Sequence, residues 1–154
     1  MKKNKTVVVI TDGHLQFAPT AFLLLQDGIH VRFQRDLNES PTSAEVPHLI
    51  ISELARPDID GLQLCRRVRG DDKFETTQVL LVGDLSKRSS IVEDGFRCGA
   101  SEYMQKPIDP VRLADVCRSL LAAGEQLLPQ PQAAGKNKFQ IILDLTRWKK
   151  LIQV

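Results

Sequence analysis

The chain has 154 residues, of which 42% are hydrophobic and 26% are charged, and its formal net charge is +2. This composition is typical of a globular protein and excludes collagen-like, low-complexity and wholly disordered chains. Apolar runs such as residues 21–25 are far shorter than the roughly 20 residues that cross a bilayer, and the N-terminus lacks the long apolar stretch and cleavage site of a signal peptide. We therefore expect a cytoplasmic protein that does not enter a membrane.

The first half of the chain alternates apolar runs with other segments. Residues 7–10 predict a first strand, and a helix should follow it. Pro19 falls inside that helix, where it would remove an amide donor, so we expect the helix to kink or to begin late and to lengthen the loop after Asp12. Residues 31–34 predict a second strand. Loop-forming residues come next, before a third apolar run at residues 49–52.

The second half continues the alternation. A turn at Asp60-Gly61 leads into a helix over residues 62–68, and residues 79–82 predict a fourth strand. A helix from Ser86 that ends at Gly99 precedes a weaker fifth strand at residues 102–105. Pro110 fits the first turn of a last helix.

Five strand–helix units in about 120 residues predict a doubly wound α/β domain with the flavodoxin-like strand order 2-1-3-4-5 and helices on both faces. Several of the runs are continuously apolar, which suits parallel strands buried on both sides. In such sheets the working site lies at the carboxyl ends of the strands. The residues that follow the predicted strands are Thr11, Asp12, Gly13, Glu53, Gly83, Asp84, Lys106 and Pro107.

The end of the chain differs in composition. We assign residues 1–124 to the domain, 125–137 to a linker by its Pro, Gln and Gly content, and 138–154 to a basic amphipathic helix or to the start of a truncated following region. Four apolar residues recur in this last segment at helical spacing, namely Ile141, Leu145, Trp148 and Ile152. A lone helix of this length is marginal in water, so it should dock on the body, on a second copy or on a following domain.

Charge and cysteine content add two expectations. Residues from 125 onward carry five basic and two acidic side chains, a net of +3, which leaves −1 for residues 1–124. A nucleic-acid-binding core therefore has no electrostatic support. Cys65, Cys98 and Cys117 are widely spaced and odd in number, which predicts reduced and mostly buried thiols.

Two segments resemble a known family. Residues 47–65 (PHLIISELARPDIDGLQLC) and 99–107 (GASEYMQKP) resemble the CheY-like receiver domains of response regulators in two-component systems, and the resemblance covers roughly residues 5–122. It implies phosphoryl transfer to an aspartate that ends the third strand. Two acids after the first strand, that aspartate and a backbone carbonyl two residues further on would bind Mg²⁺. A lysine after the fifth strand and a Ser or Thr after the fourth would hold the phosphoryl oxygens.

The acidic half of this pattern is altered. Glu53 stands at the phosphoacceptor position, one methylene further out than an aspartate, and Thr11 replaces the first of the two acids while Asp12 keeps the second. We expect at most a weak Mg²⁺ site between Asp12, Glu53 and the Ala55 carbonyl, because a hard cation loses one formal charge here. Two simpler interpretations stay open: Glu53 is a tolerated surface carboxylate, and Asp12 only caps the following helix.

The phosphate-binding half is altered as well. Gly83 stands where the Ser or Thr should be and supplies no hydroxyl, unless a different register lets Asp84 or Ser86 act instead. Lys106 is present and is expected to pair permanently with Glu53 or Asp12; the alternative is a solvated lysine.

Three further positions of the family pattern are kept. Pro107 follows the lysine, and the resemblance implies a cis bond before it. Gly61 has a structural role, and Tyr103 occupies the switch position. Tyr103 turned inward with Lys106 on Glu53 would indicate a frozen active-like state, and Tyr103 turned outward would indicate the resting one.

We interpret the sequence as a pseudo-receiver in a two-component phosphorelay context, a protein-interaction module rather than an enzyme. It would act without phosphorylation, through the face of the fourth helix, fifth strand and fifth helix around Lys87, Arg88, Tyr103 and Arg112. That face would bind a protein partner or a second copy, and the family resemblance suggests a relationship to a sensor histidine kinase. Two alternatives are a working phosphoreceiver with an unusual acceptor and a DNA-binding regulator that uses the basic tail.

Overall fold

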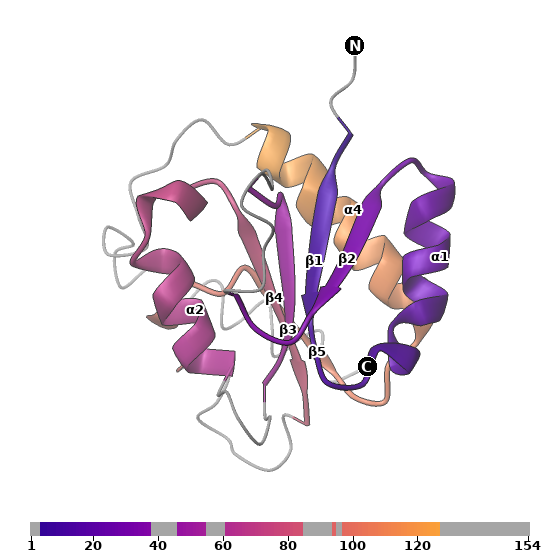
Figure 1. Cartoon of the computed structure of the whole chain (residues 1–154), viewed down its shortest axis with the longest axis horizontal. Helices are drawn as coiled ribbons and strands as arrows, with labels where there is room; N and C mark the ends of the chain where they lie inside the picture. The colour runs from indigo at the N-terminus through magenta and orange to yellow at the C-terminus, as the bar shows by residue number, and fades with distance from the viewer. Residues whose placement is uncertain (1–3, 38–45, 55–60, 85–93, 95–96, 127–154) are drawn as a thin grey trace.

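The computed structural model describes residues 4–37, 46–54, 61–84, 94 and 97–126 (Figure 1). The named elements within these ranges are β1 (Thr6–Ile10), η1 (His14–Gln16), α1 (Ala18–Gln26), β2 (His30–Gln34), β3 (Leu49–Glu53), α2 (Gly61–Arg69), η3 (Asp72–Phe74), β4 (Gln78–Gly83), β5 (Glu102–Gln105) and α4 (Pro110–Gln126). All five predicted strands are present, and the helices predicted after the first, third and fifth strands are present too.

The strands form one parallel sheet in the order β2-β1-β3-β4-β5, which confirms the predicted topology. The central strands β3 and β4 are buried along their whole length, as the continuously apolar runs within them indicate. β3 and β4 each run one residue further than predicted, so Glu53 and Gly83 are the last residues of their strands. In this register Glu53 pairs with Val82, and Gly83 pairs with Gln105.

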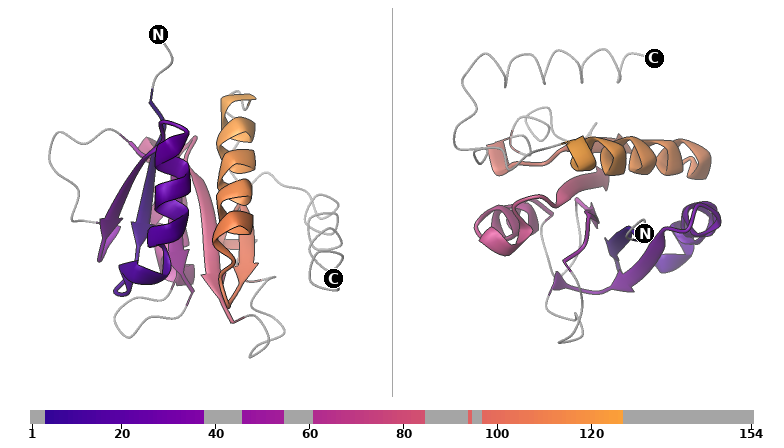
Figure 2. Two further views of the ribbon diagram at one scale, coloured as in Figure 1. Left: turned by 90° about the vertical axis from the view of Figure 1, so that its right-hand side faces the viewer. Right: turned by 90° about the horizontal axis from the view of Figure 1, so that it is seen from above.

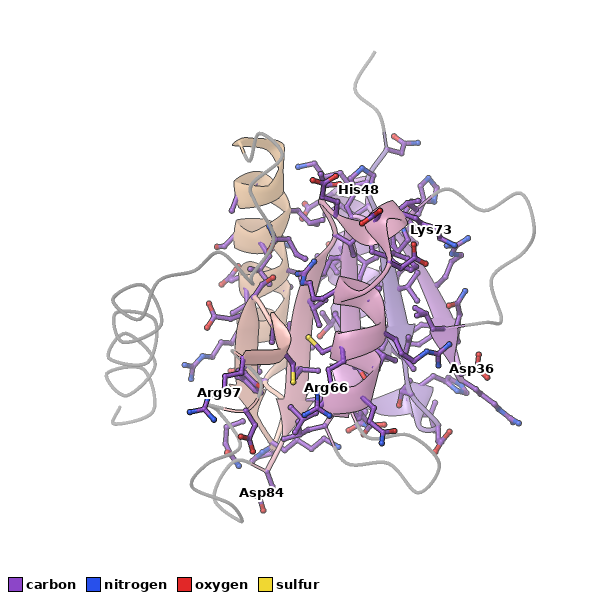
Figure 3. The ribbon with its side chains drawn as sticks, turned by 90° about the vertical axis from the view of Figure 1, so that its left-hand side faces the viewer. Asp36, His48, Arg66, Lys73, Asp84 and Arg97 are labelled. Carbon is purple, nitrogen blue, oxygen red and sulfur yellow. The ribbon has the colours of Figure 1, made fainter. Side chains whose placement is uncertain are left out.

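Helices cover both faces of the sheet (Figure 1). On one face α2 packs its apolar residues onto alternate residues of the strands, among them Val8, Ile50 and Leu81 (Figure 3). On the other face α1 and α4 pack onto Val7 and Ile51 and their neighbours in the sheet. Side chains alternate between the faces of a strand, so one short apolar run supplies both cores.

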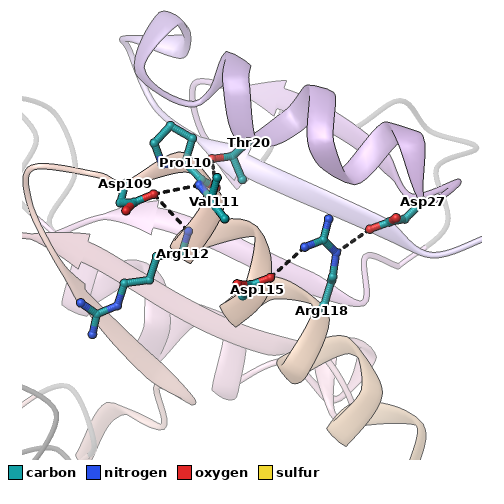
Figure 4. A network of polar contacts seen from close by, with 8 residues as sticks. All are labelled: Thr20, Asp27, Asp109, Pro110, Val111, Arg112, Asp115 and Arg118. Carbon is teal, nitrogen blue, oxygen red and sulfur yellow. Dashed lines mark hydrogen bonds and ion pairs between the residues drawn. The ribbon is translucent and has the colours of Figure 1, made fainter.

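The first helix begins late, as Pro19 predicted. A single 3-10 turn, η1, follows the loop after β1, and Pro19 is the second residue of α1, where a missing amide hydrogen costs little. From there α1 runs beside α4 (Figure 2). The Thr20 hydroxyl donates to the Pro110 carbonyl, and Arg118 pairs with Asp27 near the other end of α1 (Figure 4).

The three cysteines are free and buried, as predicted. Burial raises the pKa of the Cys65 thiol and of the Cys117 thiol to about 12. Across the described ranges, no helix combines the length and the apolar character that a membrane crossing needs.

Some predictions fall outside the described residues. They concern Ala55, Asp60, Ser86, Lys87, Arg88 and the segments 127–137 and 138–154. Within the helix predicted from Ser86 to Gly99, the described residues Asp94, Arg97 and Cys98 are helical, and Gly99 is a turn residue with a positive φ. The domain extends further toward the C-terminus than expected, because α4 includes residues 125 and 126, which we had assigned to the linker.

Candidate functional site

The predicted site residues meet at one edge of the sheet. Thr11 directly follows β1, Glu53 ends β3, Gly83 ends β4 and Lys106 directly follows β5. Because the four strands are parallel neighbours, their carboxyl ends lie side by side, and the residues at those ends can converge.

Glu53 is the centre of this convergence. Its Oε1 accepts hydrogen bonds from Lys106 Nζ at 2.6 Å and from Gln16 Nε2 at 2.8 Å, and its Oε2 accepts one from Thr11 Oγ1 at 2.7 Å. The Glu53 side chain is 9% exposed, whereas that of Lys106 is 35% exposed. The interpretation of Glu53 as a tolerated surface carboxylate is therefore wrong, and so is that of Lys106 as a solvated lysine.

The hydrogen-bond donors around Glu53 lower the pKa of its carboxyl by more than burial raises it. Burial alone would raise the pKa of the Glu53 carboxyl, but the hydrogen bonds from Lys106, Thr11 and Gln16 and the positive charge of Lys106 together hold it below its ordinary value. Glu53 is therefore a carboxylate at neutral pH. A buried carboxylate with this many donors is held in one position.

Thr11 supplies a donor that an acid at its position would lack. Its Oγ1 accepts a hydrogen bond from the Gly13 amide at 3.0 Å, which leaves the hydroxyl hydrogen to point at Glu53. An ionised aspartate at position 11 could only accept, and it would place a second negative charge against Glu53. Thr11 thus replaces an acid that would repel the Glu53 carboxylate by a hydroxyl that donates a hydrogen bond to it.

Gln16 is a site residue that the sequence analysis missed. It lies in η1, and its side-chain amide reaches Glu53 from the segment between β1 and α1. Pro19 was the available signal, because it delays the helix and leaves this segment free to fold over the ends of the strands. Nothing in the sequence indicated which side chain of that segment would turn inward.

Leu54 is a second residue that the sequence analysis missed, and its side chain packs against Gly83. A Cβ atom added to Gly83 would lie 2.7 Å from Leu54 Cβ and 3.3 Å from Leu54 Cδ2. The Leu54 amide donates to the Val82 carbonyl at 2.7 Å, and the Leu54 side chain is buried. Leu54 therefore occupies the space that a serine or threonine side chain at position 83 would need.

The remaining predicted positions are in place. The Lys106–Pro107 peptide bond is cis, as the resemblance implied, and the Lys106 amide donates to the Gly83 carbonyl. Tyr103 is 4% exposed and belongs to the core on the α2 face, so it is turned inward. Gly61 allows a close approach, because a Cβ there would lie 2.7 Å from the Glu53 carbonyl oxygen.

The alternative strand register, in which Asp84 or Ser86 would take the place of Gly83, does not form. Gly83 is the last residue of β4 and pairs with Gln105. Asp84 accepts a hydrogen bond from Gln105 Nε2 at 3.1 Å, and its side chain points away from the sheet (Figure 3).

The described residues do not fit a resident magnesium ion. Both oxygens of Glu53 already accept strong hydrogen bonds, one of them from a lysine ammonium, and Thr11 offers a neutral hydroxyl in place of a charge. Asp12 is exposed. Within the described ranges, no three His, Cys, Asp or Glu side chains are grouped to hold a metal. Asp12 is not the N-cap residue of η1 or α1, because these begin after Gly13 and Phe17.

Comparison with known families gives one match that covers most of the chain. The model described as the response regulator receiver domain matches residues 7–118. Among curated proteins, Rre1, a response regulator of Synechocystis, is 28% identical over 68% of this chain. The DNA-binding dual master transcriptional regulator RpaA of the same organism and the response regulator PleD of Caulobacter vibrioides are each 33% identical over 60% of it. The matches span 52%, 36% and 21% of the lengths of these three relatives.

Solved structures agree with this match. The receiver domain of a signal transduction histidine kinase from Syntrophus aciditrophicus is 26% identical and superposes with a TM-score of 0.65 over 84% of this chain and 98% of its own. A CheY-like receiver domain protein from Methanospirillum hungatei is 18% identical and has a TM-score of 0.68 over 80% of this chain and 98% of its own, which supports the fold alone.

Proposed function

Because the chain belongs to the response regulator receiver domain family of two-component signalling, we propose that it is a receiver whose output does not depend on phosphorylation. The protein would act as an interaction module in a fixed conformation. The position that accepts a phosphoryl group in the family would hold a permanent carboxylate instead.

The set of contacts at Glu53 is the observation that carries this proposal. A phosphoacceptor needs a free oxygen for in-line attack, together with cationic groups that can stabilise the transferred phosphoryl group. Here Lys106 is already bound to the carboxylate at 2.6 Å, and Thr11 and Gln16 also donate hydrogen bonds to it. Attack would have to break these bonds, and a displacement of about 1 Å can cost on the order of 100-fold in rate.

The switch residue supports a fixed state. Tyr103 is turned into the core and Lys106 is bound to Glu53. This is the combination that we associated with a frozen active-like conformation. In the proposed mechanism, the Glu53 carboxylate takes the place of the acyl phosphate as the permanent partner of Lys106. Without a hydroxyl at Gly83, no group would couple the occupancy of the pocket to Tyr103.

The interaction surface is proposed on β5 and α4, together with the predicted helix around Lys87 and Arg88, two residues that lie outside the described ones. Arg112 is exposed on α4, and its side chain points away from α1 (Figure 4). Tyr103 is buried, so it would shape this face from below rather than touch a partner. Receiver domains generally work with histidine kinases and other signalling proteins, and we propose such a partner or a second copy here.

Acetyl phosphate with Mg²⁺, followed by intact-mass measurement, tests the proposal. We expect no added phosphate on the wild-type chain. Glu53→Asp alone should stay unmodified as well, because Thr11 still replaces one acid and Gly83 still lacks a hydroxyl. The matched control is the double variant Thr11→Asp/Glu53→Asp, which restores both carboxylates and should take up more phosphate than Glu53→Asp does.

One result would overturn the proposal. A stoichiometric phosphate on the wild-type chain, mapped by fragmentation to Glu53 or to another residue of the pocket, would identify a working phosphoreceiver with an unusual acceptor. A phosphate mapped outside the pocket would leave Glu53 as the permanent carboxylate that we describe.

A further inference from the structure

α1 leaves an apolar surface uncovered. Its inward side is formed by Phe17, Thr20 and Leu24, which are at most 2% exposed. On its outer side Phe22 is 61% exposed and Leu25 is 59% exposed. Residues three apart in a helix share a face, so these two side chains form one outward stripe.

Two more exposed apolar side chains lie on η1 and β2, the elements that neighbour α1. Leu15 in η1 is 78% exposed, and Phe33 on the edge strand β2 is 39% exposed. The ring of His14 lies edge-on against the ring of Phe33 and connects η1 to β2. We call Leu15, Phe22, Leu25 and Phe33 the apolar α1 surface. Four of the five large hydrophobic side chains that are exposed among the described residues belong to it, and a concentration of this kind marks a binding surface.

The chain itself contains a segment that matches this surface. In residues 138–154 the apolar side chains Ile141, Leu145, Trp148 and Ile152 follow helical spacing. As a helix, the stripe from 141 to 152 would be about 16 Å long, and α1, with nine residues, is about 14 Å long at the same rise per residue. A helix with one apolar face needs a cover for that face in water.

The connection is long enough. α4 lies beside α1 and ends at Gln126, and the eleven residues 127–137 can span at most about 36 Å. Packed helices lie only about 8–10 Å apart. We propose that residues 138–154 form a helix that docks on the apolar α1 surface of the same chain. This proposal does not depend on whether the pocket is phosphorylated.

Trp148, the only tryptophan in the chain, makes the test direct. In the full-length protein we expect blue-shifted emission of Trp148 and protection from a soluble quencher. The double variant Phe22→Gln/Leu25→Gln should lose both, because it makes the surface polar. Both residues are exposed, so the urea midpoint of the domain should change little. The matched control is Val111→Gln on α4, which is 60% exposed, lies outside the apolar α1 surface and should leave the emission unchanged.

A second variant separates docking from other causes. Leu145→Gln/Ile152→Gln changes the segment rather than the surface and should expose Trp148 to the same degree. The proposal is overturned if the wild-type emission equals that of the chain in urea, or if the Phe22→Gln/Leu25→Gln change leaves it unaltered. It is also overturned if dilution removes the blue shift as a dimer dissociates, since the occupant would then be the segment of a second copy.

Discussion

Gly83→Ser is the substitution that would restore a hydroxyl to the pocket, and the structure predicts that it destabilises the fold. The new Cβ would lie 2.7 Å from Leu54 Cβ, where ordinary van der Waals contact begins at 3.4 Å. One of the two strand ends must therefore move by several tenths of an ångström. The Leu54 atom involved is attached to the backbone, so a change of rotamer cannot relieve the contact.

Overpacking of this kind costs about 1–3 kcal/mol. In urea, where small proteins have slopes of about 1–3 kcal/mol per M, this is a decrease of the unfolding midpoint on the order of 1 M. Circular dichroism during urea titration measures it. In a Leu54→Ala background the 3.3 Å contact with Cδ2 disappears while the contact with Cβ remains. The cost of serine should therefore become smaller there without vanishing.

Gly124→Ser is the control, since a Cβ at that position on α4 meets only the Gln78 side chain, at 3.7 Å or more. Serine also forms helix better than glycine, so this variant should be neutral or slightly stabilised. An unchanged urea midpoint for Gly83→Ser would refute the reasoning, because it would mean that Leu54 does not fill the position of the missing hydroxyl.

Three further predictions follow from the described contacts. Lys106→Met should lower the free energy of unfolding by about 1–3 kcal/mol in urea titrations, since Glu53 keeps its other donors but loses a charged one; no change would mean that the ion pair is solvent-screened. The folded-state pKa of Glu53 is depressed, so its contribution to stability is present above the ordinary value of 4.5 and is lost as the pH falls through the folded value. The difference in unfolding free energy between wild type and Glu53→Gln should accordingly be constant near neutral pH and shrink under acid; a difference that grows on acidification would contradict the assignment. Cys65 and Cys117, with pKa values of about 12, should react with a thiol reagent at neutral pH only after denaturation, and rapid labelling of the native chain would contradict their burial.

The sheet could be predicted because each strand is short, apolar and followed by a connection long enough for a crossover. The same logic located the site, since residues after parallel strands must share an edge. It also brought Glu53 and Lys106 together, which are 53 positions apart in the chain. These conclusions depend on strand order alone and not on the details of side-chain packing.

The contacts of Gln16 and Leu54 could not be predicted in this way. Gln16 is a polar residue in an irregular segment, and its direction depends on the turn that Pro19 imposes. Leu54 follows the strand that carries Glu53 and looks like any apolar residue at the edge of a core. Its effect on Gly83 arises from the spacing of two neighbouring strands, which a linear pattern does not contain.

Because Leu54 fills the space beside Gly83, the absence of a hydroxyl from this pocket is difficult to reverse. A single substitution at position 83 would collide with Leu54, so a descendant of this protein would regain a phosphate-sensing hydroxyl only at a cost in stability. A shift of the neighbouring strand end would have to accompany it. Selection on such a lineage would more readily refine the surfaces of the domain than reopen its switch.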